Sequence, residues 1–322
     1  MRERKKKVRE EAKMKNLKLA FAGGGPFAEP IFAKLVEDFD NLTLISKEDK
    51  PSGRGGKTEK SAIKTLAESK NIPIYEPKNK VELEEIISRI KPDLVVVVSL
   101  GIIITENTLK IPNYGFLNVH FSLLPLYRGP SPVQATILSG DKRGGFTIQK
   151  VVPEIDAGDI IYKQEIDLSG GETTQSLGKE LSDLAALKIA DIIQSYISGN
   201  ITPQPQEQAK AMFSKMIKKS NGKIDWSESA EIIERKVRAY TSWPSAYTYW
   251  NGKMLKIIET DILSQDSGER IGTFLDLGDK KCGVQTGNGI LVIKKLQLEG
   301  KKPLNVSDFL LGNSKIINEV LS

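Results

Sequence analysis

The order of apolar and polar positions divides the chain into a long first part and a shorter second part. In residues 17–197, apolar runs of strand length alternate with segments whose apolar positions recur every three or four residues, as in helices. Strands joined by helices indicate a mostly parallel sheet that is covered by helices on both faces. We expect strands at 17–22, 42–46, 72–75, 93–99, 116–120, 146–152 and 160–166, and helices at 26–38, 61–70, 81–90 and 173–197, with Ser61 as a helix cap.

The second part of the chain has the pattern of a small all-β domain. A proline- and glutamine-rich stretch at 203–222 indicates a linker, and a helix is expected at 229–240. The pairs Asn251-Gly252 and Asn288-Gly289 each lie between two apolar runs, which is the pattern of a tight β-hairpin. Short strands that close on themselves predict a small OB-like β-barrel. We therefore expect a basic extension at 1–16, a Rossmann-like α/β domain at 17–202, a linker at 203–222 and a barrel domain at 223–322.

Composition narrows the classes of protein that fit this pattern. The 322 residues include one cysteine and one histidine, which excludes an internal disulfide, a thiolate metal cluster and a multi-histidine metal site. Apolar runs are too short to cross a bilayer, and residues 1–16 are charged without an apolar core, so neither a membrane span nor a secretory signal is expected. A cytoplasmic, metal-free protein is the resulting expectation.

The net charge of +6 is concentrated at the two ends of the chain. Residues 1–16 supply +5 and residues 206–322 supply +4, whereas the stretch between them is slightly acidic. This distribution indicates an anionic partner that contacts the extension and the second half. A solvated surface with a frayed N-terminal extension is the alternative for the extension.

A glycine-rich turn after the first strand resembles a dinucleotide-binding fingerprint. Gly23, Gly25 and Ala28 fit the G-x-G-x-x-A pattern, and acidic residues follow the second strand. However, Pro26 lacks the backbone N–H that a pyrophosphate would use at the start of a helix. We therefore interpret this segment as a tight strand-to-helix turn.

Three polar residues are candidates for chemistry. Asn118 and His120 are two apart on one expected strand, so their side chains project from the same face. Asp156 lies in an acidic loop between two later strands, and ligands of open α/β sheets bind where strands end. An amide can donate to a developing oxyanion, an imidazole can relay a proton, and a carboxylate can accept one. The alternatives are a core histidine and a turn aspartate without chemical roles.

The sequence around these residues resembles the 10-formyltetrahydrofolate-dependent formyltransferases. The similarity lies in residues 118–125, in Tyr127-Arg128-Gly129 with Pro132, and in the run 156–159. It extends from about residue 17 to the C-terminus, and the basic loop at 50–57 is similar to that of members that formylate methionyl-tRNA. The resemblance implies that 17–202 is a formyltransferase catalytic domain and that 223–322 is a tRNA-binding domain.

The resemblance also implies a role for each motif residue. Asn118 and His120 would polarise the formyl oxygen, and Asp156 would help remove the proton from the attacking amine. The implied reaction transfers the formyl group of 10-formyltetrahydrofolate, a co-substrate, to the methionine amine of initiator tRNA in translation initiation, without a metal and by a monomer. Formylation of an amino-sugar nucleotide is the alternative. The implied folate contacts are Leu100, Gly101, Ile102, Ser122, Leu123, Leu124 and Pro125, and the implied tRNA contacts are Arg54 and Lys57.

Overall fold

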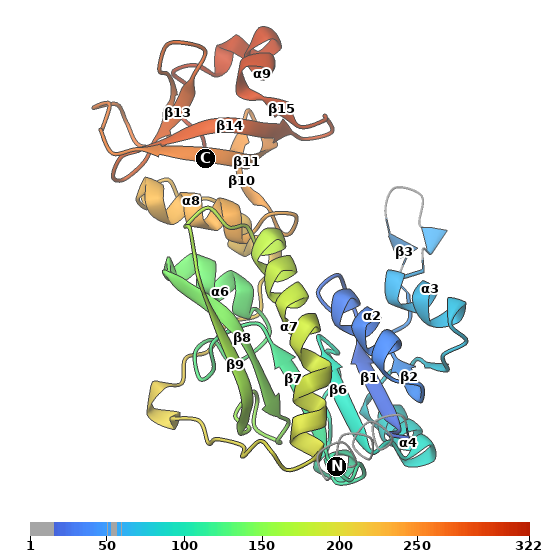
Figure 1. Ribbon diagram of the computed structural model, residues 1–322. Coiled ribbons are helices and arrows are strands. Elements are labelled where there is room, and N and C mark those ends of the chain that lie inside the picture. The colour runs from blue at the N-terminus through green and yellow to red at the C-terminus, as the bar shows by residue number, and fades with distance from the viewer. Residues whose placement is uncertain (1–15, 50, 53–56, 59) are drawn as a thin grey trace. The chain divides into compact units, whose positions relative to one another are not determined.

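The structure is a computed structural model that describes residues 16–49, 51–52, 57–58 and 60–322 (Figure 1). These residues form two compact units, which are described separately. The first contains the described residues of Met1–Pro132 together with Gly144–Ile166 and Gly178–Phe213, and the second contains Val133–Arg143, Asp167–Leu177 and Ser214–Ser322. The expected extension, apart from Asn16, lies outside the described residues, and the boundaries of the four expected segments stay predictions.

The first unit is built on a seven-stranded sheet with the order β5-β2-β1-β6-β7-β8-β9. The five strands from β5 to β7 pair in parallel, and β8 runs antiparallel to β7, which confirms the expected Rossmann-like α/β class. A separate two-stranded ribbon is formed by β3 and β4. The strands are β1 Leu19–Gly23, β2 Leu42–Ile45, β3 Pro51–Ser52, β4 Lys57–Thr58, β5 Ile74–Tyr75, β6 Leu94–Val98, β7 Phe116–His120, β8 Arg143–Lys150 and β9 Ile160–Asp167.

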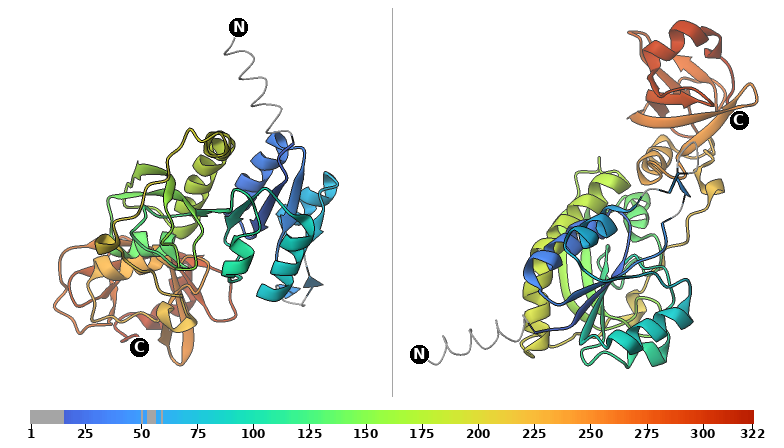
Figure 2. Two further views of the ribbon diagram at one scale, coloured as in Figure 1. Left: turned by 90° about the horizontal axis from the view of Figure 1, so that it is seen from below. Right: turned by 90° about the vertical axis from the view of Figure 1, so that its right-hand side faces the viewer.

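Helices cover both faces of this sheet because the central strands are apolar on both sides (Figure 2). On β1, Ala20 and Ala22 face a core that includes Leu83 and Ile87 of α4. Phe21 points the other way and packs against Phe32 of α2, with ring centroids 5.1 Å apart. The helices of this unit are α2 Glu29–Asp38, α3 Ala62–Ser69, α4 Lys80–Ile90, α5 Glu106–Leu109 and, from Gly178 onward, α7 Thr174–Ile197. Helix α6 Pro132–Ser139 belongs from Val133 onward to the second unit.

The start of α2 and the capping of α3 differ from what the sequence predicts. Helix α2 begins at Glu29, three residues after Pro26, because residues 24–28 form a turn in which the amide of Ala28 donates to Gly25. The amide of Gly24 donates to the carbonyl of Val98, so two N–H groups of this turn are bound within the protein. Ser61 does occupy the N-cap position of α3, but its hydroxyl makes no capping hydrogen bond.

The second unit contains a six-stranded antiparallel sheet. Its order is β10-β11-β14-β13-β12, with β15 added beside β14 (Figure 1). Both Asn-Gly pairs lie in turns between adjacent antiparallel strands, as predicted. The elements are α8 Ala230–Ala239, β10 Ala246–Trp250, β11 Lys253–Leu263, β12 Phe274–Asp276, β13 Cys282–Gln285, β14 Ile290–Leu298, β15 Leu304–Asn305, α9 Val306–Asn313 and the 3₁₀ turns Lys219–Gly222 and Ser314–Ile316.

The C-terminal residues connect the two edge strands of this sheet. Asn318 and Leu321 donate to carbonyls at the start of β12 and just before it, and Ser322 exchanges backbone hydrogen bonds with Tyr249 of β10. The sheet therefore curls around a single core, to which α8 contributes Ile233 and Val237. This arrangement confirms the expected barrel-like second domain.

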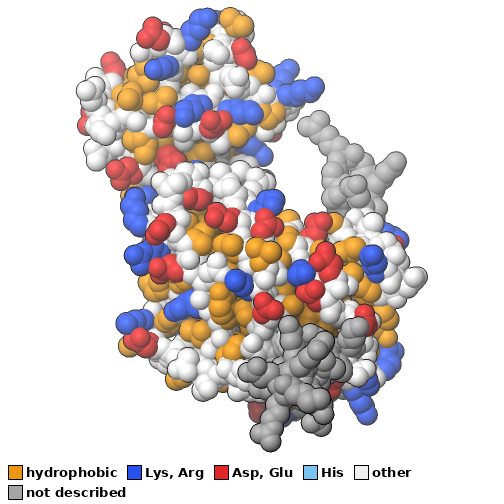
Figure 3. All heavy atoms as spheres, viewed as in Figure 1, with side chains coloured by type: hydrophobic (Ala, Val, Ile, Leu, Met, Phe, Trp, Pro, Cys, Tyr) orange, Lys and Arg blue, Asp and Glu red, His pale blue; other side chains and the backbone are white. Residues whose placement is uncertain are grey.

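Two features are absent from the described residues. Within the part of the chain that the structure describes, no helix is long and apolar enough to cross a membrane. In the same residues, no group of three or more metal-ligating side chains comes together. On the face shown in Figure 3, basic and acidic side chains are interspersed with hydrophobic ones.

Candidate functional site

The site begins with the pairing of β7 and β8. In this antiparallel pair, Asn118 lies opposite Gln149 and His120 lies opposite Thr147. Because side chains alternate along a strand, these four project from the same face of the sheet. Gln149 is buried at 1% exposure. A polar cluster is thereby built at the end of a parallel strand, beside the first antiparallel one.

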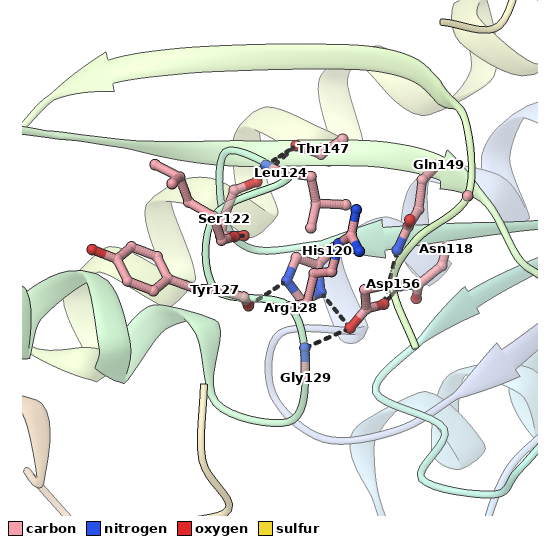
Figure 4. A network of polar contacts seen from close by, with 12 residues as sticks. Asn118, His120, Ser122, Leu124, Tyr127, Arg128, Gly129, Thr147, Gln149 and Asp156 are labelled. Carbon is pink, nitrogen blue, oxygen red and sulfur yellow. Dashed lines mark hydrogen bonds and ion pairs between the residues drawn. The ribbon is translucent and has the colours of Figure 1, made fainter. Parts of the chain in front are cut away.

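Asp156 lies at the centre of this cluster (Figure 4). Its Oδ1 accepts from Gln149 Nε2 at 2.8 Å and from Asn118 Nδ2 at 3.3 Å. Its Oδ2 accepts from the amide of Gly129 at 2.7 Å and lies 3.6 Å from His120 Nδ1. The structure therefore brings Asn118, His120 and Asp156 together, although 36 residues separate the last two.

Unusual backbone conformations create this geometry. Tyr127 (φ 58°) and Asp156 (φ 49°) are left-handed, a conformation that costs a non-glycine residue about 1–2 kcal/mol. Gly129 has φ 107°, a value that needs glycine, and this turn aims its amide at Asp156. Gly158 is required for a different reason, since a Cβ there would lie 1.8 Å from the carbonyl oxygen of Lys150.

His120 is buried and has partners on both sides of its ring. Its Nε2 lies 3.0 Å from the carbonyl oxygen of Tyr127, which requires Nε2 to carry a proton. Burial lowers the pKa of His120 below its ordinary value, and the Asp156 carboxylate partly opposes this shift. The neutral ring with Nε2–H therefore presents the lone pair of Nδ1 on the side of Asp156.

Thr147 fixes the loop that follows His120. Its hydroxyl donates to the carbonyl of Ser122 at 2.7 Å and accepts from the amide of Leu124 at 3.1 Å. The Ser122 hydroxyl in turn donates to the carbonyl of Leu126 at 2.6 Å. These bonds hold the loop in the path that carries Tyr127 and Gly129 back to the site.

A segment expected to be a linker also contacts the site. Residues 204–213 include the 3₁₀ turn Gln208–Lys210 and run beside the loop 125–128, where Arg128 and Met212 share a backbone hydrogen bond. Gln206 is buried, and its amide reaches the carbonyls of Asp156 and Gly158. Nothing in the proline- and glutamine-rich composition of this stretch identified a buried glutamine.

An open cleft of about 510 Å³ borders the outer side of the Asp156 loop. Its walls include Lys150 and Val152 from the sheet side, and Ile155 and Phe213 contribute exposed apolar surface. The cleft lies within the first unit and gives solvent access beside the polar cluster.

Comparison of the sequence with known protein families decides the class. Residues 17–192, more than half of the chain, match the family described as formyl transferase, and residues 216–314 match the formyl transferase C-terminal domain. The chain belongs to the formyl transferase family. The resemblance seen in the sequence motifs is therefore confirmed.

Relatives of this formyl transferase cover nearly its whole length. A methionyl-tRNA formyltransferase of Clostridium novyi is 36% identical over 95% of this chain and 100% of its own. One of Citrifermentans bemidjiense is 37% identical over 93% of this chain and 94% of its own. Both similarities include the two matched domains.

Solved structures share the fold at lower sequence identity. A methionyl-tRNA formyltransferase from Clostridium thermocellum has a TM-score of 0.53 and 21% identity, covering 79% of this chain and 95% of that one. An N-formyltransferase from Helicobacter canadensis, solved with folinic acid and dTDP-3-aminofucose, has a TM-score of 0.66 and 20% identity, covering 86% and 98%. At these identities the likeness supports the fold alone.

The expected folate contacts of this formyl transferase lie on two neighbouring loops. Residues 100–102 follow β6 and residues 122–125 follow β7, and these two strands are adjacent and parallel. The side chains of Leu100, Ser122 and Leu124 are buried, while Gly101 is exposed and its carbonyl accepts from Lys47 Nζ at 2.9 Å. The loops are thus placed at one edge of the sheet, and the folate contacts stay predictions.

The expected tRNA contacts are placed only in part. Arg54 lies outside the described residues. Lys57 belongs to β4 of the small ribbon Pro51–Ser52 with Lys57–Thr58. Their roles stay predictions.

Proposed function

We propose that this chain transfers the formyl group of 10-formyltetrahydrofolate to the free α-amine of methionine on initiator tRNA. The observation that carries the proposal is the convergence of Asn118, His120 and Asp156 at the end of β7. Full-length relatives named methionyl-tRNA formyltransferase support the acceptor. A formyl transfer needs a donor for the oxyanion and an acceptor for the amine proton, and this cluster contains both.

In the proposed reaction, the amine nitrogen attacks the formyl carbon and forms the new C–N bond. Asn118 is partly exposed, and its amide donates to the formyl oxygen as that oxygen gains negative charge. The Asp156 carboxylate, aimed by the donors around it, takes the proton that the amine loses. The bond between the formyl carbon and the folate nitrogen then breaks, and that nitrogen receives a proton.

His120 acts in this proposal through its Nδ1 side. Nε2 donates its proton to the carbonyl of Tyr127, so Nδ1 of the neutral ring carries a lone pair and can receive the proton that Asp156 takes from the amine. Because its pKa is lowered, the ring is neutral at pH 7 and needs no proton loss before the reaction.

The positive charge of the second half fits an RNA acceptor. Residues 206–322 carry a net charge of +4, and Lys294, Lys301 and Lys302 lie on the barrel unit. Phosphate neutralisation by such residues makes affinity fall steeply with salt. A monomeric, cytoplasmic enzyme is part of the proposal.

A formyl-transfer assay tests the function directly. Labelled 10-formyltetrahydrofolate is supplied together with initiator methionyl-tRNA, and in parallel with an amino-sugar nucleotide. We expect the label on methionyl-tRNA, and a loss of about 100- to 1000-fold in rate for Asn118→Ala with the fold retained. Label on the sugar nucleotide alone would assign the enzyme to the alternative class, and an undiminished Asn118→Ala rate would overturn the site.

A further inference from the structure

We infer that Gln206 is a positioning residue for Asp156, acting through an ordered chain of amide groups. The chain runs from the Arg128 guanidinium through Gln206 and Gln149 to the carboxylate. This inference rests on the proposed function and adds a residue that lies in the stretch expected to be a linker. Arg128, Gln206 and Gln149 are 4%, 6% and 1% exposed, so water has little access to this chain.

The direction of the chain is set at its arginine end. Arg128 donates to Gln206 Oε1 from Nε at 3.1 Å and from Nη2 at 2.7 Å. An arginine side chain can only donate, so the oxygen of the Gln206 amide must face it. The Gln206 NH₂ group therefore points away from Arg128 and toward the Asp156 loop.

The Gln206 NH₂ group meets three oxygens. These are the carbonyls of Asp156 at 2.9 Å and Gly158 at 2.7 Å, and Gln149 Oε1 at 3.2 Å. Two bonds hold the loop backbone on both sides of residue 157. The third fixes the Gln149 amide with its oxygen toward Gln206, so its own NH₂ must point at Asp156 Oδ1, as observed at 2.8 Å.

The backbone of the loop at Asp156 is held by the same two glutamines. Asp156 has φ 49°, a left-handed conformation that aspartate adopts more readily than most residues, and the contacts around it select that conformation here. Gln206 binds the carbonyl of this same residue, and Gln149 binds its side chain. The pair therefore fixes both the backbone and the carboxylate of Asp156.

Gln206→Glu separates positioning from general stability. A glutamate still accepts from Arg128, and with a full charge, so this contact is strengthened. Its second oxygen, however, would face the carbonyl oxygens of Asp156 and Gly158, which it repels. The Gln149 amide would also rotate to donate to this oxygen, and its own Oε1 would then face the Asp156 carboxylate. We expect kcat for formyl transfer to fall by about 10- to 100-fold, the size typical of a misplaced reacting group, with KM for both substrates little changed.

Gln208→Glu is the matched control. Gln208 also accepts from Arg128, from Nη1 at 2.9 Å, but it is exposed, and the hydrogen bonds to the carbonyls of Asp156 and Gly158 come from Gln206. The same chemical change there should alter kcat by no more than about twofold. Gln206→Met, which removes the amide without adding charge, is a second variant whose folding can be checked by urea unfolding, and we expect the same fall in kcat.

Hydrogen–deuterium exchange of the peptide 152–160 gives a readout that does not depend on the acceptor. We expect faster exchange in both Gln206 variants than in wild type and Gln208→Glu. Wild-type kcat and exchange in folded Gln206→Glu or Gln206→Met would overturn the inference, as would equal losses in Gln208→Glu. A wild-type protein that does not formylate methionyl-tRNA would overturn the proposed function instead, and the exchange experiment would then still decide the role of Gln206.

Discussion

Replacing Asp156 by asparagine tests the arrangement of donors at the site, because it keeps the size of the side chain and changes one oxygen into an NH₂ group. Oδ1 faces N–H groups of Asn118 and Gln149, and Oδ2 faces the amide of Gly129. In either orientation, the new NH₂ group points at a donor. An asparagine at this position therefore cannot satisfy its surroundings.

The size of the effect follows from these contacts. An unsatisfied buried donor costs about 1–3 kcal/mol of folding free energy, which is less than the roughly 5–15 kcal/mol that stabilises a typical domain. The variant should therefore fold. Loss of the group that accepts the amine proton should lower the rate by about 100- to 10,000-fold.

The assay is single-turnover formyl transfer to initiator methionyl-tRNA, with urea unfolding measured on the same preparations. Asp159→Asn serves as the control, since it removes the same charge from the same loop and no hydrogen bond of the Asp156 carboxylate involves it. We expect Asp159→Asn to keep most of the wild-type rate. If folded Asp156→Asn transferred formyl groups as fast as wild type, the proton-accepting role would be wrong.

Four further predictions follow from other features. The lowered pKa of His120 means that below pH 6.5 the unfolded chain binds a proton that the folded protein does not. The free energy of unfolding should therefore fall by up to about 1.4 kcal/mol for each pH unit below 6.5. In urea titrations between pH 5 and 6.5, the free energy of unfolding of His120→Gln should depend less steeply on pH than that of wild type. Gly158→Ala should lower both urea midpoint and turnover, because a Cβ would collide with the Lys150 carbonyl, and an unchanged midpoint would contradict that packing. Burial raises the pKa of the Cys282 thiol to about 11, so a thiol reagent at pH 8 should modify the native protein far more slowly than the urea-unfolded one. KM for methionyl-tRNA should rise steeply between 50 and 200 mM salt, as expected for roughly 6–10 phosphate contacts, while a flat salt dependence would argue against a basic binding surface.

Much of the fold could be predicted because its signals are local. The buried strands are continuous apolar runs, and the Asn-Gly pairs fix the hairpins through their turn conformation. The start of α2 was predicted three residues too early, because Pro26 is equally suited to a turn. Closure of the barrel by residues 318–322 could not be predicted, since that segment pairs with strands distant in sequence.

The candidate site was predictable only where one strand carries it. The two-residue spacing of Asn118 and His120 places them on one face, and the same spacing of Thr147 and Gln149 on β8 was an available signal for the rest of the cluster. The amide of Gly129 and the carbonyl of Tyr127 are backbone groups, which the sequence does not distinguish from any others. Gln206 was missed because its burial depends on tertiary contacts of a segment with linker-like composition.

The position of residues 204–213 matters for anyone who divides or recombines this enzyme. A fragment that stops at residue 202 would contain every motif of the first domain and yet leave the Asp156 loop without the groups that hold its backbone. A chimera with a relative should exchange its parts after Phe213, so that Arg128 and Gln206 come from the same parent. Boundaries chosen from composition alone would instead separate the Asp156 carboxylate from the groups that position it.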